Sequence, residues 1–153
     1  MTELFQDDEY DRRFAGVAKI YSEDTFSHYE KSHVMVIGIG GVGSWAVEAL
    51  ARTGVGELTL IDMDVVAASN INRQLPAMSS TLGMDKIEVM AERCRSINPR
   101  IKINLIDDYL TPENVKELLA EAPDLILDCI DDVKAKLALM LHCRFNKIPL
   151  IVS

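Results

Sequence analysis

The strongest constraint on the fold of this chain is an apolar run that ends in closely spaced glycines. Residues 33–37 are mostly apolar, and Gly38, Gly40, Gly41 and Gly43 follow before a helical pattern begins. Such a run predicts a buried strand, a tight turn and a helix start. The spacing of Gly38, Gly40 and Gly43 fits the G-x-G-x-x-G pattern of phosphate-binding loops. There the first glycine makes the turn, the second lets a phosphate approach the backbone, and the third lets helix and strand pack closely.

A second apolar run, residues 58–61, ends in Asp62. This acid follows the glycines by about 20 residues, which is where nucleotide-binding folds hold a ribose hydroxyl. Strand, glycine turn, helix, strand and acid in this register predict nucleotide binding. The simpler alternative is a bare glycine turn that only lets the helix pack, with Asp62 capping a turn.

The rest of the chain alternates between helical and strand-like patterns. We expect helices over residues 41–53, 83–97, 111–121 and 131–145, and strands over residues 57–62, 101–106, 125–128 and 148–152. This alternation predicts an α/β fold: a Rossmann-like, doubly wound, mostly parallel sheet with helices on both faces. Two parts are expected, an N-terminal helical segment over residues 1–30 and a nucleotide-binding domain over residues 31–153.

Within the N-terminal part, residues 1–8 are expected to form an irregular terminus. Residues 11–29 look helical, with Gly16 and Ser22 as candidate breaks. The apolar residues expected on one side of this segment are Phe14, Val17, Ile20, Tyr21 and Phe26. Trp45, in the predicted helix after the glycine turn, is expected to pack.

Composition excludes several classes of protein. The net charge of −8 argues against a generic basic surface for nucleic acid, although not against a local basic patch. Cys94, Cys129 and Cys143 form no C-x-x-C pair, so we expect buried, reduced thiols. No apolar run approaches the roughly 18 residues of a membrane span, and the N-terminus does not resemble a signal peptide, which favours a cytoplasmic protein. Because the sequence stops on a strand-like run, we expect a fragment of a longer chain.

Three further polar residues follow Asp62, and an ordinary dehydrogenase has no need for them. Asn70, Arg73 and Lys86 could clamp a polyphosphate, because Arg holds phosphate oxygens bidentately and Lys acts as a point charge. Asp131, just after a predicted strand, could hold a magnesium ion that bridges the phosphates. Cations around a polyphosphate suit attack on ATP, since they neutralise the charge that builds as pyrophosphate leaves.

Less specific interpretations of these residues stay open. Arg73 and Lys86 could be solvated surface charges. Asp131 competes with Asp128 and Asp132 for the metal role, because acids are also favoured at the start of a helix. Of the three acids, Asp128 is expected to be structural.

With these residues the chain resembles the E1-like ThiF/MoeB superfamily of ATP-dependent activating enzymes. The positions that match the motifs of this superfamily are Gly38, Gly40, Gly41, Gly43, Asp62, Asn70, Arg73, Gln74, Lys86 and Asp131. Asp64 is also expected to bind the cofactor. Residues 13–21, 43–54 and 144–150 are similar to one branch of this superfamily, the dehydratases of tRNA threonylcarbamoyladenosine (t6A).

The resemblance implies an activity and its participants. ATP, with Mg²⁺ held by Asp131, would activate the carboxylate of t6A on a tRNA, and the activated group would close to a cyclic product with net loss of water. Arg13 matches an arginine that reaches the ATP of the partner subunit, which implies a homodimer. The implied catalytic residues are Arg13, Arg73, Lys86 and Asp131. A sulfur-transfer protein is a second candidate partner.

The chain departs from the pattern at two positions. Val65 stands where the superfamily usually repeats an acid after Asp64, and Pro76 stands where the dehydratases commonly have His. Both departures leave the structure of the neighbouring loop open.

Three other functions remain as alternatives. The first is an adenylyltransferase that activates the C-terminal glycine of a ubiquitin-like sulfur carrier. The second is a nicotinamide-dependent oxidoreductase, against which Arg73 and Lys86 argue. The third is a domain that only binds nucleotide or dimerises, without catalysis.

Overall fold

The computed structural model describes residues 3–153, with side chains from Glu9 onward. The helices are α1 (Glu3–Tyr21), α2 (Glu23–Tyr29), α3 (Gly43–Thr53), α4 (Lys86–Ile97), α5 (Val115–Leu118) and α6 (Val133–Asn146), with a 3₁₀ turn η1 (Ala68–Asn70). The strands are β1 (His33–Ile37), β2 (Glu57–Ile61), β3 (Lys102–Ile106), β4 (Leu125–Asp128) and β5 (Leu150–Val152). No helix in the described part of the chain has the length and apolar character needed to cross a membrane.

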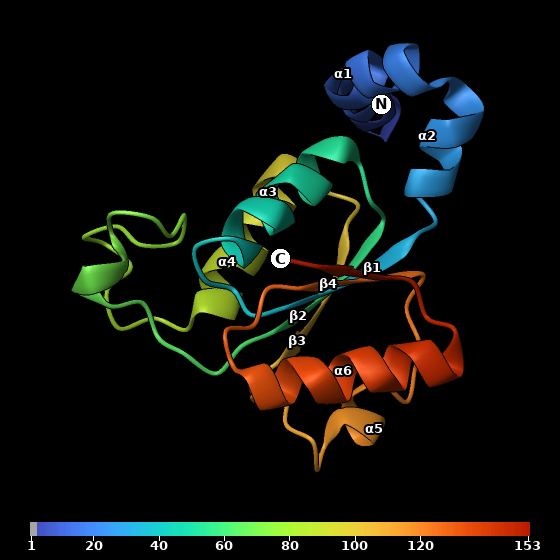
Figure 1. The fold of residues 1–153 in the computed structure, drawn as a ribbon. Coiled ribbons are helices and arrows are strands. Elements are labelled where there is room, and N and C mark those ends of the chain that lie inside the picture. The colour runs from blue at the N-terminus through green and yellow to red at the C-terminus, as the bar shows by residue number, and fades with distance from the viewer. Residues whose placement is uncertain (1–2) are drawn as a thin grey trace.

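The five strands form one parallel sheet in the order β3-β2-β1-β4-β5. Helices α3 and α4 cover one face, and α5 and α6 cover the other, as Figure 1 shows. The predicted α/β fold with a parallel sheet and helices on both faces is therefore confirmed. Because the chain leaves β1 toward β2 on one side and reaches β4 on the other, a crevice opens at the carboxyl ends of β1 and β4.

Side chains of β1 alternate between two hydrophobic cores, as expected for a strand covered on both faces. Val34 and Val36 pack into the core under α3 and α4. Met35 and Ile37 pack into the core under α5 and α6. Burial on both faces explains why this strand reads as an almost continuous apolar run.

An ion-pair cluster joins the middle of α3 to the C-terminal half of α4. Glu48 on α3 is 8% exposed and accepts hydrogen bonds from Arg93 on α4, at 2.5 Å to Nε and 3.0 Å to Nη2. Arg52 donates to the same carboxylate at 2.8 Å. Burial alone would raise the Glu48 pKa, but the hydrogen bonds from Arg93 and Arg52 outweigh it and hold that pKa below its ordinary value.

The N-terminal part differs from the expectation in three ways. Helix α1 begins at Glu3, so the prediction of an irregular terminus is wrong for residues 3–8, while residues 1 and 2 lie outside the described part. The helical segment breaks at Ser22 and not at Gly16. Phe14 is buried against Phe26, but Ile20 and Tyr21 are 76% and 53% exposed. Only part of the predicted apolar side therefore packs on this chain.

Two further predictions were wrong. The helix expected over residues 111–121 is a single short helix, α5, because Thr111 and Asn114 close a hydrogen-bonded turn ahead of it. Trp45 does not pack in the core: it is 54% exposed, and its indole N–H donates to the Arg73 carbonyl at 3.0 Å. This bond joins the start of α3 to the loop that carries Arg73.

Candidate nucleotide-binding site

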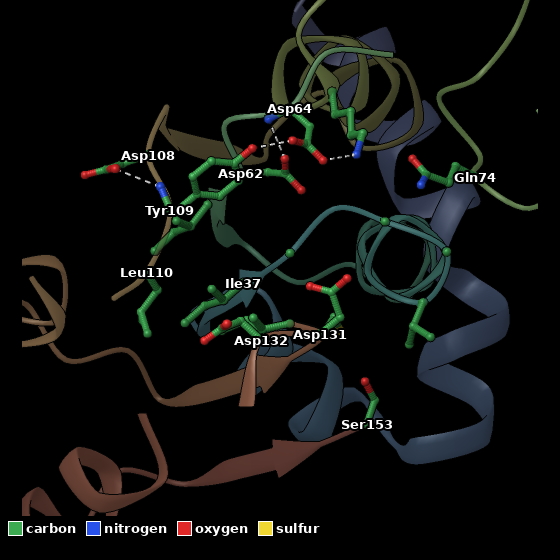
Figure 2. Close-up of a pocket in the computed structure, with 18 of the residues that line it drawn as sticks. Ile37, Asp62, Asp64, Gln74, Asp108, Tyr109, Leu110, Asp131, Asp132 and Ser153 are labelled. Carbon is green, nitrogen blue, oxygen red and sulfur yellow. Dashed lines mark hydrogen bonds and ion pairs between the residues drawn. The ribbon is translucent and has the colours of Figure 1, made fainter. Parts of the chain in front are cut away.

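A pocket of about 1180 Å³ lies at the carboxyl end of the sheet. Predicted site residues that line it are Gly38, Gly40, Gly41, Asp62, Asp64, Asn70, Arg73, Gln74, Lys86 and Asp131. They come from the ends of β1, β2 and β4, from the loop around η1 and from the start of α4. Figure 2 shows the acidic members of this set around the pocket. The fold therefore brings together residues that are up to about 90 positions apart in sequence.

The first and last glycines of the turn are needed for packing. Gly38 has φ +89°, and a Cβ there would meet the Cys129 carbonyl oxygen at 2.6 Å. A Cβ on Gly43 would lie 1.8 Å from the Gly38 carbonyl oxygen. Gly43 is buried and does not line the pocket, which is the packing role expected of the third glycine.

The middle glycines face open space or a flexible side chain. A Cβ on Gly40 would have its nearest neighbour at 3.9 Å, on the Gln74 amide. A Cβ on Gly41 would touch the aliphatic carbons of Arg73 at 3.5 and 3.6 Å. The fold itself does not demand glycine at Gly40, so the bare backbone there is available to a ligand.

Asp62 is buried, 7% exposed, at the end of β2 and is held by two backbone N–H groups. Its Oδ2 accepts from Ile39 at 2.6 Å and its Oδ1 accepts from Asp64 at 2.7 Å. The first of these bonds ties the acid directly to the glycine turn. A carboxylate oxygen can accept more than one hydrogen bond, so Asp62 keeps acceptor capacity for a ribose hydroxyl.

Arg73 and Asn70 belong to the loop around η1. Asn70 accepts from the Ala67 N–H at 2.9 Å and so caps the 3₁₀ turn. Arg73 donates through Nη1 to the Ser69 carbonyl at 3.0 Å and to the Asn72 side chain at 2.9 Å. These bonds hold the guanidinium beside Gly41, and neither partner is a carboxylate. An arginine held in this way is suited to binding an anion.

Lys86 opens α4, and its side chain is 5% exposed. Its ammonium lies 2.7 Å from Asp64 Oδ2, while Asp64 Oδ1 accepts from the Tyr109 hydroxyl (Figure 2). The hydrogen bonds from Lys86 and then Tyr109 lower the Asp64 pKa, so this carboxylate is ionised at neutral pH. The alternative that Lys86 is a solvated surface charge is therefore wrong.

Gln74 is 8% exposed, and its Oε1 has no hydrogen-bond partner in the described part of the chain. A buried amide oxygen without a partner is costly, so a site of this kind is expected to gain a donor when it is occupied. Gln74 lies beside Gly40 on the pocket wall.

The three acids after β4 have separate surroundings. Asp128 is fully buried and pairs with Lys136 at 3.0 Å, consistent with the structural role expected of it. Asp132 caps α6 by accepting from the Ala135 N–H at 2.7 Å. Asp131 is exposed, lines the pocket and has neither of these roles. Of the three acids, Asp131 is therefore the one that lines the pocket without serving as a cap or as the partner of Lys136 (Figure 2), and its metal role stays a prediction.

The donor set around Asp131 fits Mg²⁺ only in part. Within residues 3–153 no three His, Cys, Asp or Glu side chains come together as a cage for a metal ion. Mg²⁺ is commonly held by one or two carboxylates, with water and substrate phosphates supplying its other ligands. Asp131 could serve as such a carboxylate beside a bound polyphosphate.

Arg13 is the one predicted catalytic residue that lies away from the pocket. Its guanidinium donates to the Ser96 and Ile97 carbonyls at 3.1 Å each, at the C-terminal end of α4, and to Glu9 at 2.8 Å. A cation at this end of a helix satisfies its last carbonyls.

Tyr109 is a pocket residue that the sequence did not reveal. It lies after β3, in a run of acidic and turn-forming residues without a recognisable motif. No local signal could have found it, because its partner Asp64 follows a different strand.

The two sequence departures have local roles. Val65 forms an isolated antiparallel bridge with Asp85, next to Lys86. Pro76 is buried, and its carbonyl accepts from the Thr81 hydroxyl at 2.5 Å. Both residues shape the loop between η1 and α4, and the pocket retains its predicted residues.

Comparison with known proteins finds relatives that match almost the whole of this chain. The chain is 51% identical over 151 residues to a tRNA threonylcarbamoyladenosine dehydratase of Haemophilus influenzae, covering 99% of this chain and 58% of that protein. It is 35% identical to a molybdopterin-synthase adenylyltransferase of the same species, covering 99% of this chain and 62% of that protein. The chain thus spans a little over half the length of these curated relatives.

A solved structure agrees closely with the fold. The crystal structure of the Escherichia coli tRNA N6-threonylcarbamoyladenosine dehydratase, TcdA, in complex with ATP matches with a TM-score of 0.93 and 48% identity. The match covers 95% of this chain and 60% of that one. The model of the ThiF family matches residues 10–153. The chain belongs to the ThiF family.

Proposed function

We propose that this chain is the ATP-binding part of an enzyme that activates the carboxylate of t6A on tRNA and converts it to the cyclic, dehydrated form. The names of the closely similar relatives support the substrate, and the TcdA structure with ATP supports the nucleotide. The observation that carries the proposal is the gathering of Arg73, Lys86 and Asp131, from three separate segments, around one glycine turn.

The chemistry fits this arrangement. A carboxylate is a poor electrophile until its oxygen becomes part of a phosphate-type leaving group. In the proposed reaction a carboxylate oxygen of t6A attacks the α-phosphorus of ATP and pyrophosphate leaves. A nitrogen of the same group then attacks the activated carbonyl carbon, and AMP leaves as the ring closes. Because this nucleophile is tethered to the electrophile, proximity supplies much of the rate.

The predicted polar residues of the pocket each have a role in this proposal. Asp62 holds the ribose, and the backbone at Gly40 and Gly41 faces the phosphates, with Asn70 and Gln74 beside them. Lys86 and Arg73 neutralise the charge that develops on pyrophosphate, and Asp64 pairs with Lys86. Asp131 would hold Mg²⁺, which supplies further charge neutralisation when bound.

A homodimer would give Arg13 its catalytic role. Lys86 begins α4 and Arg13 contacts the other end of this 12-residue helix, so about 18 Å of helix separates the two positions. Arg13 therefore does not reach the pocket of its own chain in this arrangement, and we assign it to the ATP of a partner subunit. In this proposal residues 1–30 contribute to the dimer and residues 31–153 form the nucleotide-binding domain. The three free cysteines and a tRNA substrate fit the predicted cytoplasmic location.

The second candidate is an adenylyltransferase that acts on the C-terminus of a ubiquitin-like sulfur carrier. The 35% identity to a molybdopterin-synthase adenylyltransferase favours it, though less than the 51% identity favours the dehydratase. A sulfur-transfer protein would then be a partner.

A pyrophosphate-release assay on the full-length protein tests the proposal. With ATP, Mg²⁺ and t6A-bearing tRNA, we expect pyrophosphate and a tRNA nucleoside whose mass is lower by one water molecule. Unmodified tRNA is the matched control and should release no pyrophosphate above background. Pyrophosphate release with a sulfur carrier, together with a carrier adenylate and no change in the tRNA, would establish the second candidate instead.

A further inference from the structure

Tyr109 lines the pocket, and the proposed function assigns it no role. Tyr109 is 51% exposed, and its hydroxyl donates to Asp64 Oδ1. The other oxygen of the same carboxylate, Oδ2, pairs with the Lys86 ammonium at 2.7 Å. Figure 2 shows the Tyr109 hydroxyl beside the Asp64 carboxylate. Asp64 therefore has one partner on each oxygen.

The backbone of Tyr109 is held firmly, so the direction of its side chain is set by the fold. Its carbonyl accepts from the Asn114 side-chain amide at 2.8 Å, and its N–H donates to Asp108 Oδ1 at 2.7 Å. The next residue, Leu110, is 6% exposed and packs in the core under α5 and α6. The loop thus presents the hydroxyl to Asp64 from a fixed position.

The hydroxyl is a donor under ordinary conditions. The hydrogen bond to Asp64 raises the pKa of Tyr109 to about 12, so the group stays protonated at neutral pH. A phenol in this state donates one hydrogen bond, and Asp64 receives it on the oxygen that Lys86 does not use.

The two oxygens of Asp64 matter because of the hydrogens on Lys86. An ammonium group has three hydrogens, and a carboxylate that has no other partner can turn to take two of them. A second bond to Asp64 would leave fewer hydrogens for phosphate oxygens. An unpartnered Oδ1 would also place more negative charge toward the pocket and oppose an anionic ligand.

We propose that Tyr109 is a positioning residue: it holds Asp64 Oδ1 and thereby keeps the Lys86 ammonium available to the phosphates of the nucleotide. This inference rests on the proposed function, because it takes ATP as the ligand of this pocket. In this inference Tyr109 affects the binding of the phosphates through Asp64 and Lys86, without contacting the phosphates itself.

The test is calorimetric titration of ATP with Mg²⁺ into the full-length protein and its Tyr109→Phe variant. Phenylalanine keeps the ring and removes only the hydroxyl. We expect ATP to bind about five-fold more weakly, as for loss of one hydrogen bond to a charged group at a half-exposed site. Adenosine, measured by competition with ATP, should bind equally to both proteins, because it carries no phosphate.

A double-mutant cycle shows whether the effect passes through Asp64. In an Asp64→Asn background, Tyr109→Phe should change ATP affinity by less than about two-fold. Equal ATP affinities of the parent and Tyr109→Phe proteins would overturn the inference and leave the proposed function standing. An undiminished effect in the Asp64→Asn background, or an equal loss of adenosine affinity, would also overturn it. If the parent protein does not bind ATP, the proposed function fails and the inference fails with it.

Discussion

Two lysine–carboxylate pairs lie at opposite ends of β2 and have the same length but different surroundings. Lys86 lies 2.7 Å from Asp64 at the carboxyl end, and Lys102 lies 2.7 Å from Glu57 at the amino end. The Lys86 side chain is 5% exposed, whereas the Lys102 side chain is 67% exposed. Water screens the exposed pair, while the buried ammonium keeps a strong field toward the pocket. Equal distances therefore do not imply equal roles, because the two lysines differ in burial and only Lys86 lies in the pocket with the glycine turn.

Replacing each lysine tests this contrast most strongly. Lys86→Met should weaken ATP binding about 100-fold, because it removes a buried cation from the phosphate site. Lys102→Met, the matched control, should leave ATP affinity unchanged and alter the free energy of unfolding by less than about 1 kcal/mol. Calorimetric titration and chemical denaturation of the full-length variants give the two measurements. Equal losses of ATP affinity in both variants would contradict a specific role of Lys86 in ATP binding.

A glycine at the amino end offers the second test, this time on stability. A Cβ on Gly56 would lie 1.8 Å from the Glu30 carbonyl oxygen, so Gly56→Ala should lower the free energy of unfolding by about 2 kcal/mol. The site at the carboxyl end should remain intact in the molecules that stay folded. Chemical denaturation measures the loss, and an unchanged midpoint would contradict the close packing seen there.

Gly40 provides the corresponding test at the carboxyl end. The nearest atom to a Cβ on Gly40 is 3.9 Å away, so Gly40→Ala should not destabilise the fold. ATP should nevertheless bind about 10-fold more weakly, because the methyl group takes up space where a phosphate meets bare backbone. Titration and denaturation of the same preparation separate the two effects. A variant that unfolds more easily but binds ATP normally would contradict this account of the turn.

An acid lies near each end of β4: Asp131 after its carboxyl end and Asp124 before its amino end. Asp131→Asn should raise the Mg²⁺ concentration needed for pyrophosphate release about five-fold, because an amide is a weaker ligand for Mg²⁺ than a carboxylate. Asp124 accepts from the His33 N–H at 2.8 Å at the amino end, so Asp124→Asn should leave the Mg²⁺ requirement unchanged. A magnesium titration of the pyrophosphate-release assay compares the two variants. The same Mg²⁺ dependence in both would contradict a metal-binding role for Asp131.

The smallest expected effect concerns acid stability. Hydrogen bonds from Lys86 and Tyr109 lower the Asp64 pKa, and hydrogen bonds from Lys102 and Asn104 lower that of Glu57. A lowered carboxylate pKa contributes stability above the unfolded value of about 4, and this contribution is lost as the pH falls through the folded pKa. Each pair is partly exposed, so each should contribute less than about 1 kcal/mol to the free energy of unfolding.

Denaturation at about pH 7 and about pH 3 measures this loss. Asp64→Asn and Glu57→Gln should each show a smaller acid-induced decrease in the free energy of unfolding than the parent protein. A larger decrease in either variant would contradict a lowered pKa for the carboxylate that was replaced.

The parts of the site that the sequence predicts are those whose signals are local. The glycine turn and Asp62 stand at the ends of adjacent strands, and a short spacing rule links them. Arg73 and Lys86 were recognised by residue type and by resemblance, and the sheet then brings them to the same pocket. The parallel direction of the strands follows from the alternation of strands and helices, because parallel strands need crossovers.

The parts that sequence reasoning missed depend on contacts between distant segments. The Tyr109–Asp64 bond joins loops that follow different strands, and no periodicity or spacing encodes it. The exposure of Trp45 depends on its bond to the Arg73 carbonyl across the loop, so residue type alone gave the wrong expectation. Helix α5 is short because the Thr111–Asn114 turn takes up the residues that were expected to begin it.

A crystal structure of the full-length protein with ATP and Mg²⁺ tests the central claim most directly. The account predicts the triphosphate at the glycine turn, with phosphate oxygens within hydrogen-bonding distance of Lys86 Nζ and the Arg73 guanidinium, and with Asp131 beside the metal. Density that places the triphosphate away from the glycine turn, with Lys86 bound only to Asp64, would contradict it.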